Sequence, residues 1–327
     1  MTKVERTGSS TLHSILARFI IRHQLNVMTP RRGGHMNLSS PNSFMIGPDD
    51  VSQADTLINH AVYNQTLVKK YIKPGYRYIG LVRHPVAWIK SASIYFTRGQ
   101  RAKKRFYIHE ANLTPEEILS DDSLLFQMRS DKSSWFHLGQ LRWYGFNYEH
   151  RNNLTAIKDF IAALVPQMDI IIINDQYDAS LVMLQRKFRW TPLDIFYNLT
   201  VTSPAPGTEK DLPAELVDKL LSAKVNLGDK LLYDTMNRTW WRQPELKENN
   251  FWDEVFHFKE LNKVVNRYCC QNSQQVKLVL PASQWHASIE VPQEICFYLR
   301  TAGGKGKTIA TLSNYSANLP YFNQPEL

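Results

Sequence analysis

Two short apolar runs that are each followed by a helix-like segment constrain the fold more than any other feature of this chain. Residues 76–82 have the pattern of a buried strand and lead into segment 85–96, whose Pro85 suits the first turn of a helix. Residues 169–173 form a second apolar run and lead into a helical segment at 177–188. Strands that alternate with helices form parallel sheets. We therefore predict an α/β fold in which a parallel β-sheet is covered by helices on both faces.

The first eleven residues predict an anion-binding loop that leads into a helix. The apolar residues that follow recur at the spacing of one helical face: Leu12, Ile15, Leu16, Phe19 and Ile20. The start of a helix has unpaired N–H groups and the positive end of the helix dipole, so an anion can bind there. The residues expected to bind it are cations, hydroxyls and one glycine: Lys3, Arg6, Thr7, Gly8, Ser9, Ser10 and Thr11. The alternative is an ordinary side-chain cap by Ser9 or Ser10 with nothing bound, and a single glycine does not make a Walker A loop.

A second candidate anion site follows the first predicted strand. Arg83 stands at the carboxyl end of that strand, and Ser91 lies about two turns into the next helix. Open α/β sheets bind ligands at this edge. A guanidinium fork and a hydroxyl placed this way can share one phosphate.

The charge balance also favours an acidic ligand. The 327 residues carry a formal net charge of +9, and the sequence pI is about 9.3. Nucleic acid is not favoured, because zinc-finger spacing, RNP-type aromatics and long basic tracts are missing from the sequence. The densest basic run, 98–105, is either a solvated loop or a further contact to an anionic ligand.

Together these segments resemble the nucleotide signature of Golgi carbohydrate sulfotransferases, and further motifs resemble the galactose 3-O-sulfotransferases, which include the galactosylceramide sulfotransferase. The family loop, roughly K-T-H-K-T-A-S-S-T, is similar to residues 3–11 of this chain. The family segment N-H-M-R-F resembles residues 59–63, and L-R-D-P…S-S-x-x-Y-F resembles 82–96. Two later family motifs, Y-F-D-E-S-L-V-L-L and D-x-x-L-Y-x-x-F-N-x-[ST]-F-W, resemble residues 176–184 and 229–241. The matches keep their order along the chain, which is more specific than any one motif.

The resemblance implies a P-loop-like sulfotransferase fold and transfer of sulfate from PAPS (3′-phosphoadenylyl sulfate). The first loop would hold the 5′-phosphosulfate, and Arg83 with Ser91 would hold the 3′-phosphate. The acceptor would be the 3-hydroxyl of a terminal galactose on a glycolipid of the galactosylceramide type or on a glycoprotein glycan. His60 falls at the histidine of the family's N-H-M-R-F segment and is the expected base; the other nine histidines have no such context. No metal is expected.

Two departures from the family pattern fall at the chemistry. Arg6 takes the position of the family's catalytic lysine and can neutralise the phosphosulfate, but its pKa is too high for it to donate a proton. Glu5 replaces a family histidine; its carboxylate is an alternative base, although it would repel an anionic donor. These changes leave open a non-catalytic relative that binds nucleotide or glycan. A uronyl 2-O-sulfotransferase, which shares the loop architecture, is a further alternative, although the motifs at 177–184 and 233–241 argue against it.

The resemblance further implies a type II Golgi membrane protein with a lumenal catalytic domain. Seven N-x-[ST] sequons agree with a glycosylated lumenal chain: Asn37, Asn64, Asn112, Asn153, Asn198, Asn237 and Asn314. Since the anion-binding loop begins at residue 3, we expect that the first strand is truncated and that the N-terminal anchor is missing from this chain. Of the three cysteines, Cys269 or Cys270 can bridge to Cys296, because an adjacent pair does not readily bond to itself.

Two regions give weaker predictions. Residues 25–50 are rich in Pro, Gly, Ser and Asn and are expected to form a loop. We divide the chain into a sulfotransferase domain at 1–270 and a C-terminal extension at 271–327, with disorder expected from about residue 311.

Overall fold

The computed structural model describes residues 1–32, 34–47, 52–97, 120, 139–199, 212–222, 226–270 and 276–301, with the side chains of 93–97, 300 and 301 left aside. Its α-helices are α1 (Ser9–Arg22), α2 (Gln65–Tyr71), α3 (Pro85–Thr97), α7 (Leu154–Leu164), α8 (Tyr177–Phe188), α9 (Pro192–Ile195), α10 (Ala214–Ser222), α11 (Leu227–Trp241), α12 (Phe251–Cys270) and α13 (Gln293–Thr301). Its strands are β1 (Met28–Pro30), β2 (His35–Met36), β3 (Phe44–Ile46), β4 (His60–Ala61), β5 (Ile79–Val82), β6 (Ile170–Ile173), β7 (Lys277–Leu280) and β8 (Ile289–Pro292). The basic run 98–105, the sequons at Asn112 and Asn314, and the tail from 311 lie outside the described residues.

The two apolar runs form the predicted parallel strands. β5 pairs with β6 in a register that begins at Ile79 opposite Ile170 and ends at Val82 opposite Ile173, and every residue of both strands is buried. α8 and α11 both pack against β6. Gly80 leaves room for the Met168 side chain and for Met236 of α11, because a Cβ there would lie 2.2 Å from the Met168 sulfur and 3.1 Å from the Met236 methyl. The mixed helix and strand content agrees with an α/β fold. Within the described residues, the parallel sheet of the main core consists of these two short strands.

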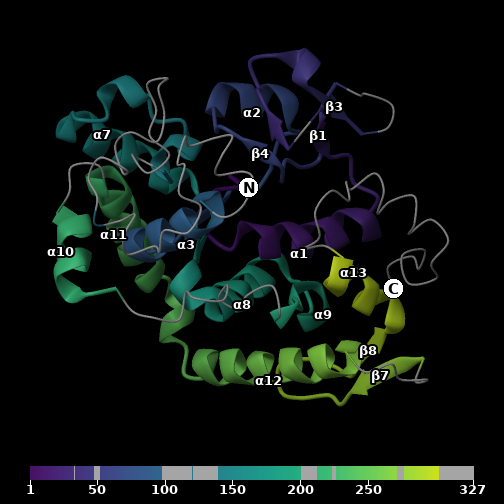
Figure 1. Ribbon diagram of the computed structural model, residues 1–327. Helices are drawn as coiled ribbons and strands as arrows, with labels where there is room; N and C mark the ends of the chain where they lie inside the picture. Colours follow the sequence, from purple (N-terminus) through teal and green to yellow (C-terminus); the bar gives the residue numbers. More distant parts are fainter. Residues whose placement is uncertain are drawn as a thin grey trace.

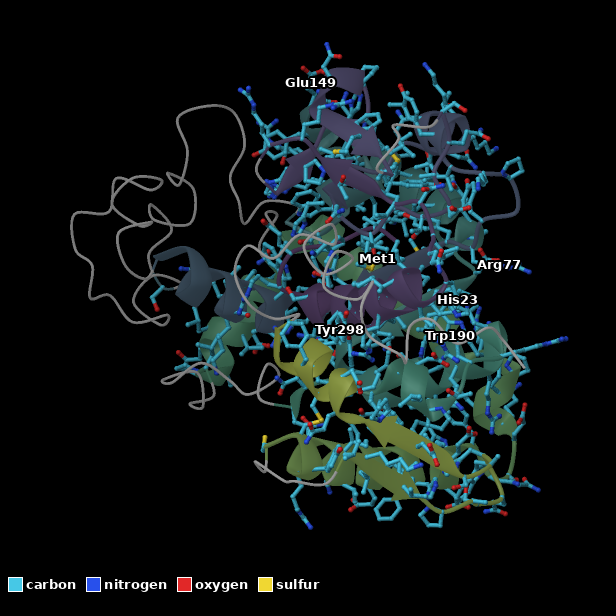
Figure 2. All side chains as sticks on the ribbon, turned by 90° about the vertical axis from the view of Figure 1, so that its right-hand side faces the viewer. Met1, His23, Arg77, Glu149, Trp190 and Tyr298 are labelled. Atoms are coloured by element: carbon cyan, nitrogen blue, oxygen red, sulfur yellow. A yellow bond between two sulfur atoms is a disulfide. The ribbon has the colours of Figure 1, made fainter. Side chains whose placement is uncertain are left out.

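The outer edge of β5 is closed by the start of the chain and by one tyrosine. The Thr2 N–H donates to the Ile79 carbonyl at 3.2 Å. The Tyr144 hydroxyl accepts from the Leu81 N–H at 2.8 Å and donates to the Leu81 carbonyl. Figure 2 shows Met1 near the centre of the molecule, beside α1, and its amino group donates to the Leu57 carbonyl at 2.8 Å. This path carries residues 3–8 to the end of β5.

Helices surround the short strand pair in layers (Figure 1). α11 packs on α7 and β5, whereas α8 packs between β6 and the long α12 at the bottom of the view. α3 begins at Pro85 and α8 spans 177–188, both as predicted. None of the helices in the described part of the chain is long and apolar enough to span a membrane.

The described part of the predicted C-terminal extension joins the main core. The β7–β8 hairpin and α13 pack against α12, and α13 also contacts α1. Ile295 and Leu299 of α13 belong to the main hydrophobic cluster, and a disulfide joins Cys269 to Cys296. This bond selects one of the two bridges that the sequence left open, and Cys270 is a free, exposed thiol.

The expectation of a loop at 25–50 is wrong. β1 and β3 form an antiparallel pair, and β2 pairs in parallel with β4. With α2 they enclose a separate small cluster of buried apolar side chains, at the top of Figure 1: Met28, Met36, Leu38, Phe44, Ile46, Ala54, Ala61, Val68 and Ile72. These strands are two or three residues long, so they are too short to show an alternating pattern. They matter because they carry His35 and His60.

Candidate active site

Residues 5–8 form a tight loop whose backbone requires glycine at one position. Gly8 has a φ of 82°, and a Cβ there would lie 2.8 Å from the Tyr177 ring and 2.9 Å from the Asn174 amide. Arg6 also has a positive φ, of 61°. Gly8 is the N-cap of α1, and the Tyr177 hydroxyl donates to its carbonyl at 3.0 Å. The close approach of α8 therefore fixes the loop and the start of α1 as one unit.

The predicted hydroxyl residues take different places in this loop. Thr7 and Ser9 are buried, and both side chains donate to the Val4 carbonyl, whereas Ser10 is exposed. The interpretation that Ser9 or Ser10 caps the helix is wrong, because Gly8 holds the cap position and no side chain caps α1. The Thr11 N–H donates to the Gly8 carbonyl at 3.0 Å, so the first-turn N–H groups that suit a ligand are those of Ser9 and Ser10. Thr11 is buried and hydrogen-bonds to the Tyr177 side chain.

The two anion sites predicted from separate motifs meet in one place. Arg6 donates to the Ser91 hydroxyl from Nε at 3.0 Å and from Nη2 at 2.8 Å. Arg83 donates from Nη1 to the Arg6 carbonyl at 3.1 Å. Burial and the neighbouring Arg6 lower the pKa of Arg83. Its buried Nε–H has no hydrogen-bond partner among the described residues. Two guanidiniums held this close, with a buried donor to spare, fit a ligand that carries several negative charges.

Two residues that the sequence analysis missed hold Arg83 in place. The Gln140 side chain accepts from the Arg83 N–H and donates to the Arg83 carbonyl, both at 2.9 Å. Asp229 of α11 accepts from the N–H groups of Gln140 and Leu141 at 3.0 and 2.9 Å. Asp229 is 1% exposed, and burial raises its pKa to about 6. Asp229 opens one of the family-like motifs, but Gln140 gives no recognisable signal in the sequence.

His60 lies across the loop from this cluster with one nitrogen already engaged. Its Nδ1 donates to the Lys3 carbonyl at 2.8 Å, so Nε2 is the nitrogen that can accept a proton. Burial, the charge of Lys3 and the neighbouring His35 lower its pKa to about 3. Burial also lowers the pKa of Lys3 to about 8. His60 is therefore neutral at pH 7, in the form that a base requires.

His35 is a further site residue, contrary to the expectation that the other histidines lack context. Its imidazole centroid lies 4.9 Å from that of His60, and both rings lie against Trp143, at 5.6 and 5.4 Å. Nε2 of His35 is 3.6 Å from Oε1 of Glu5. The ring pair follows from the β2–β4 register, in which His35 stands opposite His60. Sequence reasoning missed it because the two residues are 25 positions apart on very short strands.

Glu5, His35 and His60 are also of the residue types that bind a transition metal, with ligand atoms all within 4.8 Å of one another. Two cations stand beside them. Lys3 contacts His60 through its carbonyl, and Arg142 approaches Glu5 to 4.0 Å. Because these charges oppose a divalent cation, the cluster suits a neutral polar ligand better than a metal ion.

Comparisons with known proteins identify the family of this chain. A family model described as galactose-3-O-sulfotransferase matches residues 1–287. The chain belongs to the galactose-3-O-sulfotransferase family. It is 25% identical over 290 residues to galactose-3-O-sulfotransferase 2 of Mus musculus, covering 84% of this chain and 70% of that protein. The Homo sapiens protein of that name is 26% identical over 282 residues, 84% and 68% of the two chains. Galactosylceramide sulfotransferase of Mus musculus is 24% identical over 284 residues, 84% and 64% of the two chains. No solved structure matches this chain.

Family membership makes the chain a carbohydrate sulfotransferase. It also favours the enzyme over the non-catalytic alternative that Glu5 and Arg6 left open. The two departures from the family pattern now have structural surroundings: Arg6 is bonded to Ser91, and Glu5 stands beside His35.

Proposed function

We propose that this enzyme transfers sulfate from PAPS to the 3-hydroxyl of a terminal galactose on a glycolipid or a glycoprotein glycan. One observation carries the proposal: Arg6, Arg83 and Ser91 are joined by hydrogen bonds just before the start of α1, and the neutral His60 is bonded to Lys3 of the same N-terminal segment. We call Arg6, Arg83 and Ser91 the donor side. We call Glu5, His35, His60 and Trp143 the acceptor side.

The donor side fits a nucleotide that carries phosphate at two positions. The N–H groups at the start of α1 and the Arg6 guanidinium would bind the 5′-phosphosulfate, with Lys3 as a further nearby cation. The unpartnered Nε–H of Arg83 and the Ser91 hydroxyl would bind the 3′-phosphate. Support comes from the bonds that join Arg6 to Ser91 and Arg83 to Arg6, since they would place the two phosphate groups side by side.

The chemistry is an in-line displacement at sulfur. Nε2 of His60 accepts the proton of the galactose hydroxyl while its oxygen forms the new bond to sulfur and the bond from sulfur to the phosphate oxygen breaks. Arg6 stabilises the charge that develops on that phosphate oxygen without giving up a proton. The protein mainly positions the two substrates and neutralises charge, as in phosphoryl transfer. No residue has to form a covalent intermediate.

We also propose that the enzyme works in the Golgi lumen. The Cys269–Cys296 disulfide supports an oxidising compartment. Asn64 and Asn153, two of the seven sequons, lie exposed at the starts of α2 and α7. Both are compatible with glycosylation at the surface.

The test is transfer of labelled sulfate from PAPS to galactosylceramide, lactose-type sugars, Galβ1-3GalNAc-type sugars and heparan, with binding of the product nucleotide measured by calorimetry. The proposal is supported if a galactoside becomes labelled and the same sugar with its 3-hydroxyl methylated does not. Label on heparan alone would assign the chain to the uronyl 2-O class. Nucleotide binding without label on any acceptor would make the chain a binding protein and overturn the proposal.

A further inference from the structure

The acceptor side brings together side chains from four separate segments. Glu5 comes from the loop before α1, His35 from β2, His60 from β4, and Trp143 from a short 3-10 helix at Leu141–Tyr144. The three aromatic rings touch one another, with centroids 4.9 to 5.6 Å apart. The Glu5 backbone is held as well, since the Trp88 indole N–H donates to its carbonyl at 2.7 Å.

This cluster offers both donors and acceptors to a ligand. The side chain of His35 is 48% exposed and that of Glu5 is 14% exposed, so solvent reaches it. Nε2 of His35 and Oε1 of Glu5 are 3.6 Å apart, beyond the length of a good hydrogen bond. Trp143 is only 6% exposed, and its indole N–H has no hydrogen-bond partner in the described part of the chain. A buried donor without a partner is costly unless a ligand or water satisfies it.

The chemistry of the cluster favours a neutral polyol. A dication would be repelled by Lys3 and Arg142, whereas the Glu5 carboxylate, whose Oε2 lies 4.0 Å from Arg142, can accept a hydrogen bond from a neutral donor. A sugar hydroxyl both donates and accepts, so one hydroxyl can donate to Glu5 while it accepts from the Trp143 N–H. The ligand atoms of Glu5, His35 and His60 lie within 4.8 Å of one another, which fits two adjacent hydroxyl groups of one ring.

We propose that Glu5, His35 and Trp143 form a subsite for the sugar hydroxyl next to the one that is sulfated, while His60 faces the reacting hydroxyl. The inference rests on the proposed function and adds a recognition element to it: the acceptor must present a vicinal diol, which a galactoside does on both sides of its 3-hydroxyl. Glu5, which replaces the family histidine, then contacts the acceptor rather than the anionic donor. Its carboxylate accepts a hydrogen bond from the sugar there.

Deoxygenated acceptors test the subsite directly. We would compare a β-galactoside with its 2-deoxy and 4-deoxy analogues, using the full chain. A site built to bond a hydroxyl rejects the analogue that lacks it, because the buried polar groups are then left unpaired. We expect wild type to lose about 10- to 100-fold in kcat/KM with one of the two analogues, the range of one hydrogen bond to a charged group.

The variants Glu5→Gln, His35→Ala and Trp143→Phe should abolish that discrimination by lowering transfer to the parent sugar toward the level of the deoxy analogue. Their Kd for the product nucleotide should stay within about twofold of wild type. Trp143→Phe removes the N–H but keeps an aromatic ring, so it remains informative where His35→Ala does not fold. His150→Ala, at an exposed position of another 3-10 helix, is the matched control.

Three results would overturn the inference. Wild type that treats both deoxy analogues like the parent sugar has no such subsite. Variants that reduce transfer to all three sugars by the same factor act on chemistry or folding instead. Variants that weaken nucleotide binding place these residues on the donor side. A wild-type enzyme that sulfates no galactoside is a different failure, because it would remove the proposed function itself.

Discussion

The two sides of the candidate site differ in how firmly the fold holds them. On the donor side, Arg83 follows a buried strand, and its backbone is clamped by Gln140, which Asp229 holds in turn; Gln140 and Asp229 are 0% and 1% exposed. On the acceptor side, His35 and His60 stand on strands of two residues each, and His35 is half-exposed. Arg83 is therefore fixed at the edge of the main core, whereas His35 and His60 lie on the smaller unit that β1–β4 and α2 form.

The difference follows from what each side has to bind. The positive charges of Arg6 and Arg83 lie close together without a ligand and repel each other. The surrounding hydrogen bonds must offset this repulsion. The proposed donor carries several negative charges, so it needs this fixed geometry. A neutral sugar makes smaller demands on charge, so short strands and loops can supply its contacts and can vary between relatives.

Removal of the base should have the largest effect. His60→Ala should lower kcat by about 100- to 10,000-fold, the range of general base catalysis, and leave nucleotide Kd unchanged. Since the pKa of His60 is lowered to about 3, its protonation should not limit activity near pH 6. A pH profile of kcat/KM from pH 5 to 8 checks this. An acid limb near pH 6.5 that disappears in His60→Gln would contradict the buried, neutral state of this histidine.

Loss of the braced guanidinium comes next. Arg83→Met should weaken binding of the product nucleotide by about 100-fold, because it removes charged hydrogen bonds at a partly buried site. The KM for the galactoside should change little, which separates the donor side from the acceptor side. Calorimetry with the 3′,5′-bisphosphate nucleotide, and with a nucleotide that lacks the 3′-phosphate, measures the nucleotide Kd and the share of the binding that depends on the 3′-phosphate. Arg242→Met, at an exposed position, is the control.

Much of the donor side could be predicted from the sequence. Arg83 directly follows a continuous apolar strand, and Ser91 lies in the helix that begins at Pro85. Local pattern alone therefore places both residues near the carboxyl edge of a sheet. The loop before α1 also carries its own signals in Gly8 and the apolar face of the helix. The sequence pattern could not predict that Arg6 meets Ser91, because that contact depends on how the loop before α1 lies against α3.

On the acceptor side only His60 and Glu5 could be predicted, and only through resemblance. His35 lies in a segment whose strands are too short for periodicity, so 25–50 was expected to be a loop. Its pairing with His60 is a long-range contact set by the β2–β4 register. Gln140 and Trp143 belong to a turn and a 3-10 helix, which local propensity does not define. Tertiary packing rather than sequence pattern decides these positions.

A smaller effect should come from the hydroxyl that joins the two arginine motifs. Ser91→Ala removes the acceptor of both Arg6 bonds, at 3.0 and 2.8 Å, and leaves that guanidinium less fixed. We expect nucleotide Kd to rise about 3- to 10-fold, the effect of one or two ordinary hydrogen bonds. Ser91→Thr keeps the hydroxyl and should restore most of the affinity. Equal losses in Ser91→Ala and Ser91→Thr would mean that packing of α3, rather than the hydroxyl, holds Arg6.

The smallest expected effect is on the pH dependence of stability, to which the buried His13 and Asp229 contribute with opposite sign. His13 lies beside Lys3 and Asn59, and burial with the charge of Lys3 lowers its pKa to about 3. Between pH 6.5 and 3 the unfolded chain binds more protons at His13 and His60, so these residues make the free energy of unfolding fall as the pH falls. Burial instead raises the pKa of Asp229 to about 6. Between pH 6 and 3.8 the folded state binds more protons there, so Asp229 makes the free energy of unfolding rise as the pH falls.

Single substitutions should therefore shift the pH dependence in opposite directions. Urea unfolding at pH 7 and pH 5 should show a smaller acid-induced loss of stability in His13→Gln than in wild type, and a larger loss in Asp229→Asn. Each change should be about 1–2 kcal/mol, since one unit of pKa shift corresponds to about 1.4 kcal/mol. His150→Gln, at an exposed position, should follow wild type. Changes of the same sign in both variants would contradict the opposite pKa shifts of His13 and Asp229, because burial of a neutral imidazole and burial of a carboxyl respond to acid with opposite sign.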